Sequence, residues 1–187
     1  MNAIIRLATP ADGPSLAEIY RPAVTESATS FELEPPDSAT MAERVEPVLK
    51  RTPWLVWERG GTVLGYAYAS AHRERAAYQW SVEVSAYVHR NARRNGVARS
   101  LYATLFPTLS AQGFHNAYAG VTLPNAASIG LHTSMGFTPI GVYHGVGYKN
   151  GAWHDVGWFE KSLKPGDDNP GPIVAYDTQA TVSVSCT

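Results

Sequence analysis

Apolar residues along the chain recur with two different periods, which predicts a mixture of helices and strands. Two helices are expected in the first fifty residues. The first follows Thr9 and its proline, the second follows Pro35-Pro36, and both carry apolar residues spaced three or four apart. Pro47 lies inside the second helix, at about residues 39–50, and should bend or shorten it. The buried faces would carry Leu16, Ile19, Tyr20 and Ala23 in the first helix and Met41, Val45, Val48 and Leu49 in the second.

Alternating or continuously apolar runs predict the strands. Gly60-Gly61 and Asn150-Gly151 are turn signals, so each should join two strands into a hairpin. Pro107 falls within a third helix, where a kink or an early end is expected. This mixture, which ends in a hairpin, fits an α+β sheet better than a doubly wound one. The expected strands are residues 4–7, 54–58, 63–71, 78–88, 117–121, 138–148 and 153–163, and the later helices are 97–112 and 126–135.

Composition narrows the possible partners. The 187 residues are 44% hydrophobic and 17% charged, which suits one globular domain, and a net charge of −1 gives no reason to expect nucleic acid. Cys186 is the only cysteine and the histidines lack zinc-site spacings, so we expect no internal disulfide and no metal. No apolar run approaches the roughly 20 residues of a membrane span. With no leader pattern at the start, a cytoplasmic protein without membrane contact is expected.

The last residues differ in composition from the rest. Residues 165–172 are rich in proline, glycine and aspartate, which predicts a linker between a domain at 1–164 and a tail at 165–187. Within the tail, residues 173–176 and 181–185 have strand-like composition. They would pack on the body or on a second subunit, or form a loose terminus.

The segment Arg93-Arg94-Asn95-Gly96-Val97-Ala98 lies where a predicted strand ends and a predicted helix begins. Free backbone N–H groups, the helix dipole and two guanidiniums would favour an anion there, so the segment is a candidate pyrophosphate site. Taken alone, such a segment is more often a solvated helix cap.

Flanking segments extend this pattern. Upstream is the strand Trp80–Val88 with Glu83 inside it, and downstream is Asn125-Ala126-Ala127-Ser128-Ile129-Gly130-Leu131-His132-Thr133-Ser134-Met135-Gly136-Phe137. At these residues the chain resembles the GCN5-related N-acetyltransferases (GNAT), whose acyl-CoA signature is Arg/Gln-x-x-Gly-x-Gly/Ala followed by Asn-x-x-Ala/Ser-x-x-x-Tyr/His-x-x-x-Gly-Phe. From about Ile4 to Leu163 it is similar to the phosphinothricin and methionine sulfoximine or sulfone acetyltransferases, through Phe31–Pro35, Trp54–Val56, Arg73–Trp80, Ala111–Phe114 and Gly147–Gly157.

The resemblance implies a fold and a reaction. The fold is a mixed sheet of about seven strands, splayed between the fourth and fifth, with about four helices. The reaction is transfer of the acetyl group of acetyl-CoA to the α-amine of a small amino-acid analogue, within a ternary complex and without a metal. Relatives of this kind are commonly homodimers, so a homodimer is expected.

Two residues are implied to be catalytic. Glu83 falls on the family's proposed general base, and partial burial in its strand would raise its pKa towards working pH. A strand glutamate turned to solvent is the alternative. His132 stands where many relatives carry a tyrosine that protonates the departing thiolate, and the alternative is a helix histidine satisfied by a neighbouring carbonyl.

The remaining site residues follow from the same resemblance. Main-chain groups near the end of the fourth long strand would bind the pantetheine, while the Arg-rich turn would wrap the pyrophosphate. Asn125 either reaches the pantetheine or only caps its helix. Arg73 and Arg75 would grip anionic ends of the substrate if the backbone there is extended, although exposed arginines are commonly structural. The cofactor residues are Ala86, Tyr87, Val88, Arg93, Arg94, Asn95, Gly96, Val97, Ala98, Asn125 and Ser128, and the substrate residues are Phe31, Arg73, Arg75 and Tyr78.

Two other functions stay open. One is acetylation of a peptide or protein N-terminus, or of another small amine, which for a peptide would need an open groove instead of a closed pocket. The other is a catalytically idle acyl-CoA-binding module, which the presence of both Glu83 and His132 disfavours.

Overall fold

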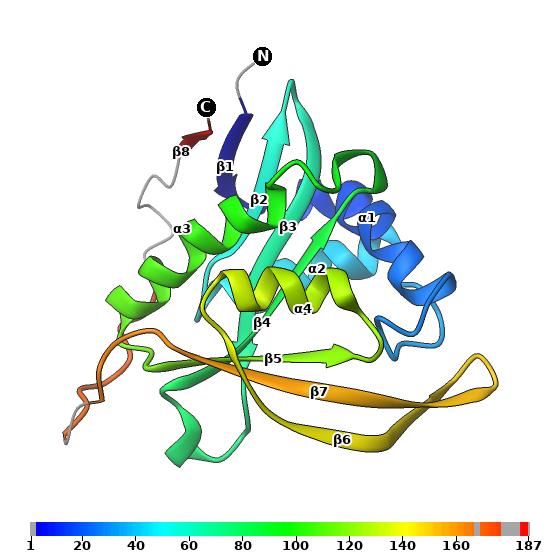
Figure 1. Cartoon of the computed structure of the whole chain (residues 1–187). Coiled ribbons are helices and arrows are strands. Elements are labelled where there is room, and N and C mark those ends of the chain that lie inside the picture. Colours follow the sequence, from blue (N-terminus) through cyan, green and yellow to red (C-terminus); the bar gives the residue numbers. More distant parts are fainter. Residues whose placement is uncertain (1–2, 167–168, 177–183, 187) are drawn as a thin grey trace.

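The computed structural model describes residues 3–166, 169–176 and 184–186, which form one twisted sheet with helices on both faces (Figure 1). The strand order is β6-β7-β5-β4-β3-β2-β1-β8, and every neighbouring pair is antiparallel except β4 and β5. The seven predicted strands are all present, and β8 is added at the edge. The strands are β1 Ala3–Leu7, β2 Trp54–Arg59, β3 Thr62–Ala71, β4 Ser81–Val88, β5 Asn116–Thr122, β6 Thr138–Lys149, β7 Ala152–Ser162 and β8 Val184–Cys186.

Each face of the sheet has its own core. Helices α1 and α2 pack on one face, whereas α3 and α4 pack on the other (Figure 1). The predicted apolar positions of α1 explain its placement, because Leu16, Ile19 and Tyr20 are all buried. The α-helices are α1 Gly13–Thr25, α2 Ser38–Leu49, α3 Val97–Gln112 and α4 Ala126–Ser134, and short 3₁₀ helices lie at Pro10–Asp12, Ala76–Tyr78 and Arg90–Ala92.

One local prediction was wrong, and one of the two outcomes expected at Pro107 does not occur. Tyr78 was expected in a strand but ends a 3₁₀ turn, and β4 begins only at Ser81. The early end expected at Pro107 does not occur, since α3 continues to Gln112. Buried Leu105 and Leu109 lie on either side of the proline, so their burial in the core outweighs the lost helical hydrogen bond.

The sheet opens between β4 and β5. These strands pair over only three positions, from Ser81 opposite Asn116 to Glu83 opposite Tyr118, although β4 runs on to Val88 and β5 to Thr122. The strands therefore diverge after Glu83, as the resemblance implies, and the rest of β4 has no partner on that side.

The described part of the tail contacts the body. Trp80 Nε1 donates to the carbonyl of Gly171 at 2.8 Å, and Gln112 and Val174 exchange hydrogen bonds of 2.8 and 3.0 Å. Val184–Cys186 pairs with Ala3–Ile5 of β1, whereas residues 181–183 of the predicted tail strand lie outside the described residues.

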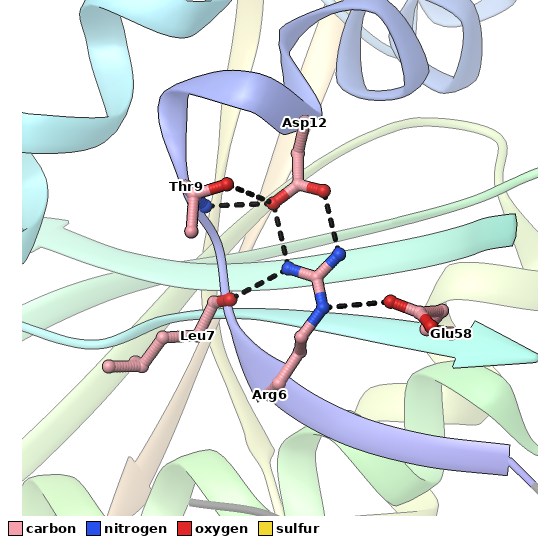
Figure 2. Close-up of polar contacts among 5 residues, drawn as sticks. All are labelled: Arg6, Leu7, Thr9, Asp12 and Glu58. Atoms are coloured by element: carbon pink, nitrogen blue, oxygen red, sulfur yellow. Dashed lines mark hydrogen bonds and ion pairs between the residues drawn. The ribbon is translucent and has the colours of Figure 1, made fainter. Parts of the chain in front are cut away.

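A charged cluster fixes the start of α1 to the sheet (Figure 2). Arg6 donates to both carboxylate oxygens of Asp12, at 2.8 and 2.7 Å, and to Glu58 at 2.8 Å. The backbone N–H of Thr9 also donates to Asp12, at 2.8 Å. Burial alone would raise the pKa of Asp12, but the hydrogen bonds from Arg6 and Thr9 outweigh it and leave that pKa below its usual value.

Candidate active site

Strand β4 points its alternate side chains to opposite faces. Val82 and Val84 are buried in the core beneath α3. Tyr87 packs on the other face, where its ring centroid lies 4.8 Å from that of Tyr20 in α1. Glu83 shares the parity of Tyr87, so its side chain lies on the α1 and α2 face at the point where β4 leaves β5.

The carboxylate of Glu83 is held through one oxygen. His72 Nδ1 lies 3.0 Å and Arg73 Nη1 lies 3.2 Å from Oε1, and both residues belong to the turn after β3. No described residue bonds Oε2. The side chain is 31% exposed, so the alternative of a glutamate turned wholly to solvent does not hold.

A pocket of about 280 Å³ lies beside this carboxylate. Arg73 lies over the ring of Trp158 at 5.8 Å and extends along the pocket wall. The lining is aromatic with a single cation, and consists of His72, Arg73, Tyr118, Ile140, Gly141, Tyr143 and Trp158.

The four predicted substrate residues are not all gathered there. Arg73 bonds Glu83, and the ring of Tyr78 lies 6.0 Å from that of His72. Phe31 instead covers Gly147 of the β6–β7 hairpin so closely that a Cβ there would lie 2.5 Å from its ring. Arg75 is exposed and does not line this pocket. A shared role for the two arginines depended on an extended backbone between them, and the structure has a bend at residues 74–75 before the 3₁₀ turn.

A second cavity fills the opening between β4 and β5. Its lining combines Ala86 and Tyr87, two of the three predicted cofactor residues of β4, with those at the start of α4, whereas Val88 does not line it. The fold thus brings together segments that are about forty positions apart in the sequence. Two buried residues of the core helices, Tyr102 of α3 and His132 of α4, also line it. The lining is Thr29, Val84, Ser85, Ala86, Tyr87, Tyr102, Gly120, Val121, Thr122, Asn125, Ser128 and His132.

The Arg-rich turn leads from β4 into α3. Arg93, Arg94, Asn95 and Gly96 are exposed, whereas Val97 is buried against Gly65 of β3. Arg94 and Gly96 have positive φ angles of 62° and 74°, and this backbone conformation favours glycine at the second position. A Cβ on Gly96 would meet nothing within 4 Å, so the requirement is for conformation and not for space.

Asn125 caps α4, because its Oδ1 accepts from the backbone N–H of Ser128 at 3.0 Å. The capping alternative is therefore present in the structure. Capping occupies only the oxygen of the amide, and Asn125 also lines the cavity between β4 and β5.

His132 is buried, with 5% of its surface exposed, and both nitrogens of its ring have a hydrogen-bond partner. Nδ1 donates to the carbonyl of Ser128 at 2.8 Å, and Nε2 lies 3.3 Å from the hydroxyl of Tyr102. Burial lowers the pKa of His132, although the bond to Ser128 opposes this effect, so the neutral ring is favoured. Nε2 is then an acceptor and the Tyr102 hydroxyl its donor. Burial also raises the pKa of Tyr102, which keeps that hydroxyl protonated.

Sequence reasoning missed His72 and Tyr102. Tyr102 lies among the apolar residues on the buried face of α3. The only available signal was that a residue with a polar hydroxyl occupies that face. His72 carried no signal, because its contact with Glu83 depends on the register of β3 against β4. Among the described residues there is no group of three or more His, Cys, Asp or Glu suited to a metal ion, and no helix with the length and apolarity of a membrane span.

Comparisons with known proteins agree with this geometry. Residues 5–158 match the family of acetyltransferase (GNAT) domains. The chain is 38% identical to a phosphinothricin N-acetyltransferase of Streptomyces viridochromogenes, over 86% of this chain and 87% of the relative. It is 34% identical to an L-methionine sulfoximine/L-methionine sulfone acetyltransferase of Pseudomonas aeruginosa, over 88% and 97%. A crystal structure of a phosphinothricin acetyltransferase from Sinorhizobium meliloti in complex with acetyl-CoA superposes with a TM-score of 0.86 at 34% identity, over 96% of this chain and 98% of that one.

Proposed function

The chain belongs to the GNAT acetyltransferases and is an acetyl-CoA-dependent N-acetyltransferase, and from that premise we propose that it acetylates the α-amine of a small amino-acid analogue of the phosphinothricin, methionine sulfoximine or methionine sulfone type. The names of the relatives support this substrate class. One observation carries the mechanism: Glu83 stands where β4 and β5 part, bonded to His72 and Arg73 of one cavity and next in sequence to Val84 of the other.

We assign the cavity between β4 and β5 to the acyl-CoA side of the reaction. The unpaired edge of β4 at Ala86, Tyr87 and Val88 offers backbone groups to the pantetheine arm, and Asn125 and Ser128 stand across the opening. At the end of β4, the free N–H groups at the start of α3, together with Arg93 and Arg94, favour the pyrophosphate. The turn Arg93–Ala98 therefore sets the direction in which the acetyl group enters.

We assign the pocket beside Arg73 to the amine. Oε2 of Glu83 accepts a proton from the substrate ammonium, and the resulting neutral amine attacks the thioester carbonyl. The C–S bond of the tetrahedral adduct then breaks, so that coenzyme A leaves as a thiolate and the nitrogen gives its second proton to solvent. The guanidinium of Arg73 suits the anionic end of an amino-acid analogue, while Trp158 and Tyr118 form apolar walls. Arg75 is exposed near Tyr78, and we retain both as outer contacts for the same substrate.

The departing sulfur needs a hydrogen-bond donor. The neutral ring of His132 has no free N–H, since Nδ1 is bonded to Ser128. We propose that His132 holds the Tyr102 hydroxyl in place until the thiolate forms, and that the hydroxyl then turns its single hydrogen from Nε2 of His132 to the sulfur. This changes the role of His132 from proton donor to positioning residue.

We also propose that the protein is a homodimer. Strand β6 is the edge of the sheet, and the β6–β7 hairpin exposes a row of large apolar side chains that monomers seldom leave uncovered. A second copy would cover them and close the nearby pocket. The row is Ile140, Val142, Tyr143, Val146, Tyr148 and Trp153.

Thiol release from acetyl-CoA tests the substrate assignment. The purified protein is assayed with phosphinothricin, methionine sulfoximine, methionine sulfone, the common amino acids, polyamines and a short peptide with a free N-terminus. We expect the highest kcat/KM among the amino-acid analogues. Preference for the peptide would support N-terminal acetylation instead, and binding of acetyl-CoA without release for any amine would leave only an acyl-CoA-binding module.

A further inference from the structure

His72 is the most constrained residue around Glu83. Its imidazole stacks on the ring of Tyr118 in β5, with centroids 4.4 Å apart and planes at 21°. The edges of Tyr78 and Trp158 meet it at 6.0 and 6.2 Å, from the turn before β4 and from β7. Rings from three separate elements thus fix the position of a side chain that is only 14% exposed.

The bond from this ring to Glu83 has a defined direction. An ionised carboxylate can only accept, so Nδ1 of His72 carries the hydrogen and donates to Oε1 across 3.0 Å. Arg73 donates to the same oxygen from 3.2 Å. With both donors on Oε1, Oε2 is the oxygen left for the substrate.

The two donor side chains differ in how freely they can move. The side chain of Arg73 is 44% exposed and lies along the substrate pocket, whereas that of His72 is enclosed. An anionic end of the substrate would compete with Glu83 for the Arg73 guanidinium. His72 would then be the donor that still holds the carboxylate.

We propose that His72 is a positioning residue for acetyl transfer, which fixes Glu83 so that Oε2 faces the amine while Arg73 turns to the anionic end of the substrate. This inference rests on the proposed role of Glu83 as general base. It assigns a function to a histidine that no motif of the sequence marks.

The test compares two replacements of the same ring. His72→Phe keeps a planar side chain against Tyr118 but removes the donor, whereas His72→Asn places an amide N–H near the former Nδ1. With methionine sulfone as substrate we expect His72→Phe to lower kcat by roughly ten- to one-hundred-fold, the loss typical of one hydrogen bond to a charged group. The KM for acetyl-CoA should stay unchanged, and His72→Asn should recover most of kcat.

The same changes in a Glu83→Gln background separate this inference from the function on which it rests. If His72 acts through Glu83, His72→Phe should reduce the residual rate of Glu83→Gln by less than about twofold. Wild-type kcat in His72→Phe, or equal losses in the Phe and Asn variants, would overturn the inference. Full turnover in Glu83→Gln alone would refute the proposed base instead. Thermal unfolding of each variant identifies any loss that is only a loss of folded protein, and His72→Gln replaces a variant that does not fold.

Discussion

The Arg6–Asp12 ion pair should contribute a measurable part of the free energy of unfolding. The substitution Asp12→Asn removes this ion pair. In Figure 2 the carboxylate accepts two hydrogen bonds from Arg6 and two from Thr9, while Arg6 is also held by Glu58. The Asn side chain keeps one acceptor but turns an amide N–H towards these donors. The exposed fractions of the Arg6 and Asp12 side chains are 28% and 9%, so the pair is only partly screened by solvent.

The expected loss of unfolding free energy lies between the loss from breaking a surface ion pair and the loss from breaking a fully buried one. Breaking a buried pair costs about 3–5 kcal/mol, and a hydrogen bond to a charged group contributes about 1.5–3 kcal/mol. Because Arg6 retains Glu58, we expect about 2–3 kcal/mol, or a fall in Tm of roughly 4–12 °C for a chain of this length. Glu58→Gln is the matched control and should cost less, since Glu58 accepts only one bond from Arg6.

The loss should also depend on pH. The pKa of Asp12 is lowered in the folded state, so its contribution is complete above the unfolded value of about 3.9 and disappears as pH falls through the folded pKa. Urea unfolding of wild type and Asp12→Asn, measured at neutral pH and at several acidic values, should show a gap that narrows below about pH 4. A gap of less than about 0.5 kcal/mol at neutral pH, or one that stays constant into acid, would refute this reasoning.

Three further predictions concern the site and the assembly. Gly96→Ala forces a φ of 74° on a residue with a Cβ, at a cost of about 1 kcal/mol, and should raise the KM for acetyl-CoA more than that for the amine; a rise in the amine KM alone would argue against a pyrophosphate site at this turn. Tyr102→Phe keeps the stacking on Phe106 and should lower kcat about tenfold with acetyl-CoA binding intact, whereas unchanged kcat would remove the hydroxyl from the reaction. Val146→Asp places a charge in the apolar row of β6 and should shift the mass found by light scattering from dimer to monomer; a wild-type protein that is already monomeric would contradict the proposed interface.

Local patterns determined much of the fold. Asn150 and Gly151 have φ angles of 53° and 77°, as their turn signal predicts, and they join β6 to β7. Strand parity placed Glu83 on the face opposite Val82 and Val84 because side-chain direction in a strand depends only on position. Such features need no knowledge of distant segments.

Contacts between distant segments could not be predicted in this way. Tyr102 and His132 are 30 positions apart and meet only because α3 and α4 pack on the same face of the sheet. His72 reaches Glu83 through the turn between β3 and β4, whose shape depends on where the 3₁₀ turn at Ala76–Tyr78 begins. The direction of the His132 proton, in contrast, depends on a local carbonyl one helical turn away, at Ser128, and such a carbonyl was the alternative that the sequence offered for this residue.

The measurement that tests the central claim most directly is single-turnover acetyl transfer by Glu83→Gln, with methionine sulfone saturating and acetyl-CoA affinity measured separately by calorimetry. If Glu83 is the general base, the acetyl-CoA Kd should stay at the wild-type value while the rate of transfer falls by roughly 10²–10⁴-fold at neutral pH. A rate equal to that of wild type would contradict the assignment of Glu83, and an equal loss of acetyl-CoA affinity would show that the residue serves binding and not proton transfer.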